Sequence, residues 1–326
     1  MFNDKSILVT GATGSFGKRF VTRLLDEHNP SRVVIFSRDE LKQFEMQQTI
    51  QSPKLRYFLG DVRDKERLHR AFQGVEIVVH AAAMKQVPAS EYNPMEAIKT
   101  NIIGAENIIN VSIDQKIEKV IALSTDKASN PANLYGATKL CSDKLFTAAN
   151  VFLSGFSGTK FSVVRYGNVI NSRGSIVPLF RQQKESGTIT ITDERMTRFW
   201  ITLDQGVNFV IKCLENMKGG EIFVPKIPSM KVTDVARAIA PDCKIKIIGI
   251  RPGEKLHEIM ITTDDSLSTL EYEDYYVIMS STVNWQSNYD NQDEDFKLVE
   301  EDFSYSSFNN QEWLTVEDFK KLASID

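Results

Sequence analysis

The first 20 residues place a glycine loop between an expected strand and an expected helix. Gly11-Ala-Thr-Gly14-Ser-Phe-Gly17 follows the apolar run Ser6–Thr10, and apolar residues then recur at helical spacing over Ser15–Glu27. Glycines permit a tight turn that brings backbone N–H groups close to a ligand. The N-terminus of the following helix favours an anion. The loop therefore predicts a sheet of the α/β class with a pyrophosphate-binding turn.

Short β-rich runs and longer helical patterns alternate as far as residue 170. Helices are expected over Ser15–Glu27, around 94–112 and over Tyr135–Ala149. Strands are expected at Ser6–Thr10, Arg32–Phe36, Leu55–Leu59, Glu76–His80, Lys119–Leu123 and Phe161–Arg165. Such alternation requires crossover connections, which build a parallel sheet with helices on both faces. We predict a Rossmann-type doubly wound parallel sheet over residues 1–170 as the dinucleotide-binding domain.

Beyond Asn168 the alternation breaks. Short strands (Thr188–Thr192, Glu221–Val224, Lys244–Ile248) mix with helices near Leu203–Asn216 and Val232–Ala240. We predict a smaller mixed α/β substrate-binding lobe over residues 171–326, with a chain that can interleave between the two parts. The acidic segment 284–303 is expected to be a solvated loop. Thr315-Val-Glu-Asp318 resembles a capping box before a last short helix.

Composition excludes several classes of protein. The 326 residues carry 39 basic and 43 acidic side chains, a net charge of -4, so the chain lacks the basic footprint of a nucleic-acid binder. Its 3 cysteines and 4 histidines are scattered, which argues against disulfides and against a metal site. No apolar run approaches the ~18 residues of a spanning helix. We expect a soluble, cytoplasmic protein without a nucleic-acid or membrane partner.

The end of the second expected strand favours NADP over NAD. Ser37 lies 20 residues after Gly17, where NAD enzymes carry a ribose-binding acid. Arg38 can instead pair bidentately with an adenosine 2′-phosphate, and Ser37 can donate to it. A shift of one residue in this alignment would make Asp39 an NAD-type acid, so that alternative stays open.

Tyr135 and Lys139 form a Tyr-x-x-x-Lys pair at the start of a helix. Residues four apart share one helix face, and a neighbouring ammonium favours the phenolate. We therefore expect a lowered pKa for Tyr135, which would let it take a proton from an alcohol as hydride leaves the same carbon. The lysine could also bind the nicotinamide ribose. Two hydroxyls, Ser124 and Thr125, precede the pair by ten or eleven residues.

The stretch from Leu123 to Lys139 adds an acid and an amine, Asp126 and Lys127, to this pair. This arrangement resembles the inverting UDP-N-acetylglucosamine 4,6-dehydratases that open the pseudaminic acid pathway, within the extended short-chain dehydrogenase/reductase superfamily. Related dehydratases have Thr-Asp-Glu where this chain has Thr-Asp-Lys. The other similar segments, which span roughly residues 5–310, are Ser37–Glu45, Gly60–Lys65, Ala81–Lys85, Glu91–Pro94, Arg165–Asn168, Arg195–Trp200, Gly220–Met230 and Arg251–Lys255. Gln86 departs from the family, which has His there, so sugar positioning is expected to differ at that point.

The resemblance implies a role for each residue of this cluster. Tyr135 would take the proton of the sugar 4-hydroxyl as carbon 4 gives hydride to a tightly bound NADP, while Lys139 holds the ribose and Thr125 contacts the 4-oxygen. A neutral Lys127 would then remove the proton on carbon 5. A protonated Asp126 would protonate the departing 6-hydroxyl, and hydride would return to carbon 6. A dry pocket or a nearby cation is expected to lower the pKa of Lys127 for this task.

The resemblance also implies the binding residues. The expected cofactor contacts are Gly11, Thr13, Gly14, Ser15, Phe16, Gly17, Ser37, Arg38, Asp39, Glu40, Leu41, Lys42, Asp61, Val62, Ala81, Lys85, Tyr135, Lys139 and Val169. The UDP-sugar would meet Lys85, Arg251 and Arg173 at its diphosphate, Thr125 and Asn168 near the sugar, and Glu254 at a ribose hydroxyl. Arg195 and Arg198 could equally lie on the surface or between subunits. A homo-oligomer, dimer or hexamer, is expected.

Three other interpretations stay open. A UDP-N-acetylhexosamine 4-epimerase shares the fold and the Tyr-Lys pair but has no use for Asp126 and Lys127. A dehydratase with added 5-epimerisation could feed capsule aminosugar synthesis. A catalytically silent scaffold that binds NADP is disfavoured because such scaffolds usually lose the tyrosine or the lysine, and this chain keeps both.

Overall fold

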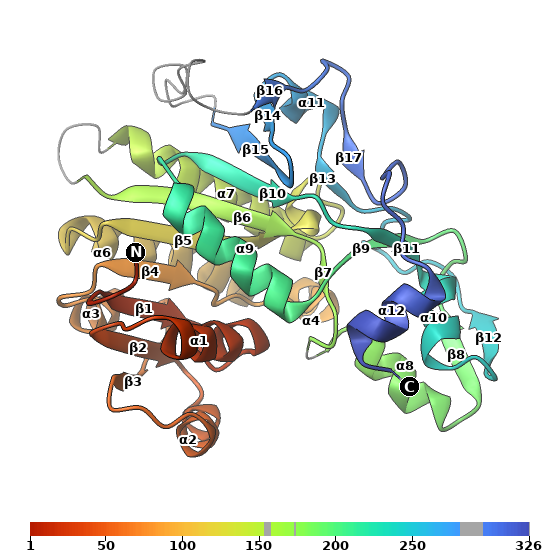
Figure 1. Ribbon diagram of the computed structural model, residues 1–326, viewed down its shortest axis with the longest axis horizontal. Coiled ribbons are helices and arrows are strands. Elements are labelled where there is room, and N and C mark those ends of the chain that lie inside the picture. Colours follow the sequence, from red (N-terminus) through yellow and green to blue (C-terminus); the bar gives the residue numbers. More distant parts are fainter. Residues whose placement is uncertain (153–157, 173, 281–295, 326) are drawn as a thin grey trace.

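A ten-stranded sheet forms the centre of the molecule (Figure 1). The computed structural model describes residues 1–152, 158–172, 174–280 and 296–325. Six strands run parallel in the order β3-β2-β1-β4-β5-β6. Their bounds are β1 (Ser6–Thr10), β2 (Arg32–Ser37), β3 (Leu55–Leu59), β4 (Ile77–His80), β5 (Lys119–Thr125) and β6 (Lys160–Tyr166). Every residue of β1 and β4 is buried, as expected for strands covered on both faces.

Helices cover both faces of this sheet. On one face α1 (Ser15–Glu27) packs against α9 (Leu203–Asn216). On the other, α6 (Gly104–Asp114) contacts both α3 (Lys65–Ala71) and α7 (Leu134–Phe152). The remaining elements of this half are α2 (Glu40–Thr49), α4 (Val87–Tyr92), α5 (Pro94–Ile98) and a π-helical turn, η1 (Lys99–Ile103). The predicted doubly wound parallel sheet is therefore confirmed, and the helix expected around 94–112 is three consecutive segments.

The chain returns to the main sheet after leaving it. β10 (Glu221–Pro225) pairs in parallel with β6, and β15 (Tyr275–Met279) pairs antiparallel with β10. β14 (Thr269–Glu271) and β16 (Lys297–Leu298) extend the same edge. Apolar residues of β10, β14 and β15 are buried in the first core, so the chain beyond residue 170 also contributes to the main sheet.

A second, smaller core lies at the carboxyl end of the parallel strands. Trp200 and Phe319 meet edge to face there, with ring centroids 5.1 Å apart. Its buried residues come mainly from β8 (Thr188–Ile191), β9 (Thr197–Ile201), β11 (Ser229–Lys231), α8 (Ile176–Lys184), α10 (Val232–Ile239) and α12 (Val316–Ala323). At its edges, β7 (Asn168–Val169) pairs with β9, and the exposed β12 (Lys244–Ile247) pairs with β8. The predicted capping box is present, because Thr315 accepts from the Asp318 N–H and Asp318 accepts from the Thr315 N–H.

Three short elements complete the described chain. They are β13 (Ile259–Ile261), its partner β17 (Tyr305–Ser306), and α11 (Thr263–Ser266). Most of the acidic segment 284–303 lies outside the described residues. Within the described ranges, no helix has the length and apolar character needed to cross a membrane.

Adding a methyl group at two helical glycines, Gly17 and Gly206, should change the free energy of unfolding in opposite directions. A Cβ on Gly17 would lie 2.4 Å from the Ala12 Cα, whereas a Cβ on Gly206 in α9 meets nothing closer than 4.0 Å. Gly17→Ala should therefore lower the free energy of unfolding by about 1–3 kcal/mol through overpacking. Gly206→Ala should raise it by up to about 1 kcal/mol through helix propensity. Urea denaturation of both variants checks this, and a Gly17→Ala protein as stable as the wild type would contradict the packing.

Candidate active site

A cavity of about 1470 Å³ opens at the carboxyl ends of the parallel strands and extends into the second lobe. It gathers most of the residues predicted from the sequence. These are Gly11, Thr13, Gly14, Ser15, Phe16, Gly17, Ser37, Arg38, Asp39, Lys42, Asp61, Val62, Ala81, Lys85, Thr125, Lys127, Tyr135, Lys139, Asn168, Val169, Arg251 and Glu254. Glu40 and Leu41 do not line it, because both lie exposed on the first turn of α2. Asp126 does not line it either, because it is fully buried behind its neighbours Thr125 and Lys127, which do. Arg173 lies outside the described residues.

The glycine loop fits a pyrophosphate. Gly14 is the N-cap of α1, and no side chain caps the helix, so its first N–H groups remain available at the cavity. A Cβ on Gly11, whose φ is +64°, would lie 2.8 Å from the Ala82 nitrogen. Position 11 can therefore pack against the segment that follows β4 only as glycine. The backbone of the loop then lies at the cavity without a side chain in front of it.

The end of β2 brings Arg38 and Asp39 to the cavity, where Arg38 is exposed and Asp39 is hydrogen-bonded to Lys42. Asp39 caps α2 by accepting from the Lys42 N–H at 3.0 Å and from Lys42 Nζ at 2.5 Å. Arg38 is two-thirds exposed, with Nη1 3.8 Å from Asp61 Oδ2. The Ser37 hydroxyl accepts from Gln43 Nε2 at 3.1 Å, which leaves its own proton to donate. A guanidinium and a hydroxyl donor therefore lie at this end of the cavity.

A buried threonine–histidine contact supports the end of β4. Thr10 Oγ1 lies 2.8 Å from His80 Nδ1 and accepts from the N–H groups of Ala81 and Ala82, each at 3.2 Å. The hydroxyl must therefore donate to His80, so Nδ1 is unprotonated. Burial, and next the charge of Lys139, lower the pKa of His80 to about 3. A neutral histidine thus fixes the backbone beside the glycine loop.

Tyr135 and Lys139 both line the cavity from α7 and are both buried. The prediction of a lowered pKa for Tyr135 is wrong in this structure. Burial raises the pKa of Tyr135 to about 12, and the opposing influences are the charge of Lys127 and a hydrogen bond with Thr125. Burial also lowers the pKa of Lys139, which the charge of Asp143 opposes. The cation that favours the phenolate is therefore Lys127 rather than Lys139.

Asp126 and Lys127 form a 3₁₀ turn, η2 (Asp126–Ala128), between β5 and α7. A Cβ on Gly136 would lie 2.2 Å from the Lys127 carbonyl oxygen, so glycine lets this turn rest on α7 beside Tyr135. Asp126 is fully buried, and its Oδ1 accepts from Thr125 Oγ1 at 2.9 Å and from Lys127 Nζ at 3.0 Å. Its Oδ2 has no hydrogen-bond partner among the described residues.

The expectation of a lowered pKa for Lys127 is also wrong in this structure. Burial alone would lower it, as predicted, but the charges of Asp126 and Glu258 more than offset burial and raise the pKa above its usual value. The pKa of Asp126 is raised by burial, against the field of Lys127, as an acid that keeps its proton requires. The lysine is therefore charged where the sequence suggested a neutral amine.

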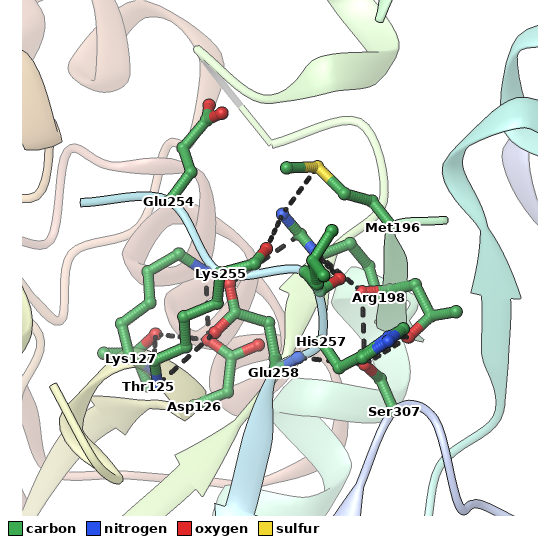
Figure 2. A network of polar contacts seen from close by, with 12 residues as sticks. Thr125, Asp126, Lys127, Met196, Arg198, Glu254, Lys255, His257, Glu258 and Ser307 are labelled. Atoms are coloured by element: carbon green, nitrogen blue, oxygen red, sulfur yellow. Dashed lines mark hydrogen bonds and ion pairs between the residues drawn. The ribbon is translucent and has the colours of Figure 1, made fainter. Parts of the chain in front are cut away.

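Sequence reasoning missed Glu258 and misjudged Arg198. Glu258 immediately precedes β13, lines the cavity and is 4% exposed, with Oε1 3.3 Å from Lys127 Nζ (Figure 2). The Arg198 side chain is 12% exposed and pairs with the same carboxylate, so within one chain it lies in the site and not on the surface. Arg195 is exposed and pairs with Asp193. The sequence could have indicated a role for Glu258, because it lies three residues after Lys255, in the loop that begins with Arg251.

The loop that begins at Arg251 closes the cavity from the second lobe. Asn133 Nδ2 donates to the Gly253 carbonyl at 2.8 Å, which ties this loop to the start of α7. Glu254 accepts from the Arg251 N–H at 3.2 Å, and the Arg251 side chain is more than half exposed. Asn168 lies in β7 beside β9, and Lys85 follows β4 with a pKa that burial lowers. The side chains predicted to bind substrate, Lys85, Asn168, Arg251 and Glu254, therefore line one cavity.

Comparison with known proteins identifies the family. A family model described as "Polysaccharide biosynthesis protein" matches residues 7–280. Over 333 residues the chain is 55% identical to the UDP-N-acetylglucosamine 4,6-dehydratase (inverting) of Campylobacter jejuni subsp. jejuni, across 99% of this chain and 98% of that protein. The chain belongs to the inverting UDP-N-acetylglucosamine 4,6-dehydratase family.

The family resemblance inferred from the sequence is thus confirmed, and other relatives show how widely the scaffold is used. The X-ray structure of Pen from Bacillus thuringiensis superposes with a TM-score of 0.90 at 38% identity, covering 99% of this chain and 98% of that chain. A UDP-glucose 4-epimerase of Rickettsia canadensis is 42% identical over 85% of this chain and 84% of that protein. Because dehydratase and epimerase names occur on this one scaffold, the chemistry must be argued from the site.

The buried histidine of this dehydratase-family chain predicts a pH-dependent stability. The unfolded chain protonates His80 below its usual pKa of 6.5, while the folded protein does so only near 3, so stability falls as the pH drops between these values. From about pH 7 to about pH 5, wild type should lose about 2 kcal/mol more than His80→Gln. Urea denaturation of both proteins at both pH values measures the difference. An equal loss in wild type and His80→Gln would contradict the assignment.

Proposed function

We propose that the chain is an NADP-dependent hydro-lyase that converts UDP-N-acetylglucosamine to the 4-keto-6-deoxy sugar with inversion at carbon 5. The observation that carries this proposal is the pairing of Tyr135 with the Asp126–Lys127 turn at one cavity wall. A 4-epimerase needs the tyrosine but neither the buried acid nor the amine. The relative from Campylobacter jejuni, 55% identical over its full length, supports the dehydratase reaction. A cytoplasmic location and a dimeric or hexameric assembly remain predictions from the sequence.

The cofactor proposed is NADP. When bound, it supplies the hydride acceptor for carbon 4 and the hydride donor for carbon 6. The uncapped N-terminus of α1 would hold its pyrophosphate, and Arg38 with Ser37 would hold its 2′-phosphate. Asp39 would be the competing NAD-type acid, but it is engaged with Lys42 as the cap of α2. Lys139 would hold the nicotinamide ribose.

Tyr135 begins the reaction by accepting the proton of the sugar 4-hydroxyl. Its pKa of about 12 is higher than this role requires, so further positive charge is needed beside the phenol. The charge of Lys127 is already included in this pKa, so the further positive charge would have to come from the bound cofactor. Thr125 hydrogen-bonds both Tyr135 and Asp126 and thereby connects the oxidation site to the elimination site.

Elimination follows from one proton shared by Lys127 and Asp126. Lys127 Nζ donates to Asp126 Oδ1 at 3.0 Å. If that proton moves from nitrogen to oxygen, a neutral amine and a neutral acid form in the same step. A sugar that covers the pair excludes water, and a low dielectric favours the neutral pair over the ion pair. Lys127 can then remove the proton on carbon 5, and Asp126 can protonate the 6-hydroxyl, which leaves as water. Hydride would return to carbon 6, and carbon 5 would take a proton from solvent on the face opposite the one it lost, which inverts that centre.

The proposed reaction can be followed by proton NMR in deuterated water with UDP-N-acetylglucosamine and the protein as isolated. We expect loss of the 6-hydroxymethyl signals, a new methyl group and deuterium at carbon 5. The couplings around carbon 5 then report inversion. Conversion to the galacto isomer with carbon 6 intact would instead establish an epimerase.

Tyr135→Phe and Lys127→Met should each lower kcat by about 10²–10⁴-fold. In Tyr135→Phe the larger isotope effect should come from 4-deuterated substrate, and in Lys127→Met it should come from 5-deuterated substrate.

The cofactor assignment predicts a selective effect of Arg38→Ala. Loss of a charged hydrogen bond to the 2′-phosphate at this exposed position should weaken NADP binding about tenfold, and NAD binding should stay unchanged. Arg56→Ala is a matched control, because Arg56 is exposed on β3 and, within the part of the chain that the structure describes, donates only to the carbonyls of Pro53 and Leu55. Calorimetric titration of both cofactors measures the effect. Equal weakening of NADP and NAD would exclude a 2′-phosphate contact.

A further inference from the structure

Glu258 is a buried carboxylate of the site to which the steps above give no role. Oε1 lies 3.3 Å from Lys127 Nζ and 3.7 Å from Arg198 Nε. Oε2 lies 3.8 Å from Lys255 Nζ and has no hydrogen-bond partner among the described residues. Three cations therefore surround one carboxylate whose side chain is 4% exposed. A buried charge is tolerated only when it is paired in this way.

Hydrogen bonds hold the backbone around Glu258. The Glu258 N–H donates to Ser307 Oγ at 3.0 Å, and its carbonyl accepts from the Ser307 N–H at 2.8 Å. Arg198 donates to the carbonyls of Lys255 and Leu256, each at 3.0 Å (Figure 2). The carboxylate is thus carried on a segment fixed both at its own residue and at the preceding turn. Such support is what keeps a functional side chain within reach of its partner.

The charge of Glu258 decides which carboxyl group of the cluster carries a proton. Burial raises the pKa of Glu258, but Lys127, Arg198 and Lys255 together lower it below its usual value. Burial and the charge of Glu258 both raise the pKa of Asp126. Without Glu258, the charges of Lys127 and Lys255 would act on Asp126 with no second carboxylate to balance them, which would favour its charged form.

We propose that Glu258 is a positioning residue of the elimination step: its carboxylate holds the Lys127 amine at the cavity wall and balances the local positive charge, so that Asp126 can serve as the neutral acid. This inference rests on the proposed dehydratase function. Glu258 acts through Lys127 and Asp126, and it has no part in the proton transfer to Tyr135. Its loss should therefore slow elimination more than oxidation at carbon 4.

The test compares Glu258→Gln with Glu271→Gln in the full-length enzyme. Glu271 is a matched control, since it also bridges two lysines, Lys226 at 2.9 Å and Lys297 at 3.2 Å, but lies on β14 away from the cavity. Glu258→Gln should lower kcat about 100-fold and leave KM for UDP-N-acetylglucosamine nearly unchanged. The isotope effect from 5-deuterated substrate should grow, and that from 4-deuterated substrate should shrink. Glu271→Gln should change none of these.

The pH dependence separates this role from a merely structural one. Removing a negative charge lowers the pKa of Lys127 and of Asp126, so the pH–kcat profile of Glu258→Gln should move to lower pH. Glu258→Asp keeps the charge on a shorter side chain, so its profile should stay in place while kcat falls by a smaller factor. An unshifted profile in Glu258→Gln, a shifted one in Glu258→Asp, or unchanged isotope effects would overturn the proposal.

A measurement without substrate distinguishes failure of this inference from failure of the proposed function. NMR titration of ¹⁵N-labelled lysine side chains, with Lys127→Met to assign the signal, should show a lower pKa for Lys127 in Glu258→Gln than in wild type. If wild type does not dehydrate UDP-N-acetylglucosamine but the titration shifts as expected, the substrate assignment fails and the charge role of Glu258 stands. If wild type dehydrates the sugar and the titration does not shift, the role of Glu258 fails alone.

Discussion

The contact between Lys127 and Glu258 joins two parts of the chain that are 131 positions apart, and the geometry of the site depends on it. Lys127 stands on the turn after β5, in the parallel sheet, and Glu258 stands before β13, on the segment that covers the cavity. Each charge helps to keep the other buried, together with Asp126 beside the lysine and with Arg198 and Lys255 beside the glutamate. The pair therefore requires the second lobe to close over the sheet at one place. The cavity that results contains the glycine loop at one end and the turn from Arg251 at the other.

Local patterns were enough to predict the sheet and to select residues that gather around the glycine-loop end of the cavity. β1, α1, β3 and α9 have the predicted bounds, because their apolar spacing and glycine or threonine caps are read within a few residues. The short strands β7, β9, β11, β13 and β17 were not predicted, since pairs of two to five residues are defined by partners far along the chain. Each of them belongs to the second lobe or to the segment around Glu258 that covers the cavity.

The errors in the site have one physical source. The roles of Tyr135 and Lys127 were assigned from neighbours in sequence, but their protonation depends on neighbours in space. Burial outweighs the charge of Lys127 at the tyrosine, and Asp126 together with Glu258, which is absent from the sequence argument, reverses the expected direction for the lysine. A motif can place the reacting groups on one turn and one helix. It cannot supply the dielectric or the third charge that sets their pKa values.

The return of β10 to the edge of β6 also has a consequence for synthesis of the chain. Domains usually fold in order as they leave the ribosome, but here the first 170 residues emerge with β6 as an unpaired edge of a largely apolar sheet. The partner strand emerges some 50 residues later, and Glu258 later still. A nascent chain could thus complete its nucleotide-binding half before the acid–base cluster has its counter-charge. The fold would delay assembly of the reactive site until most of the protein has been made.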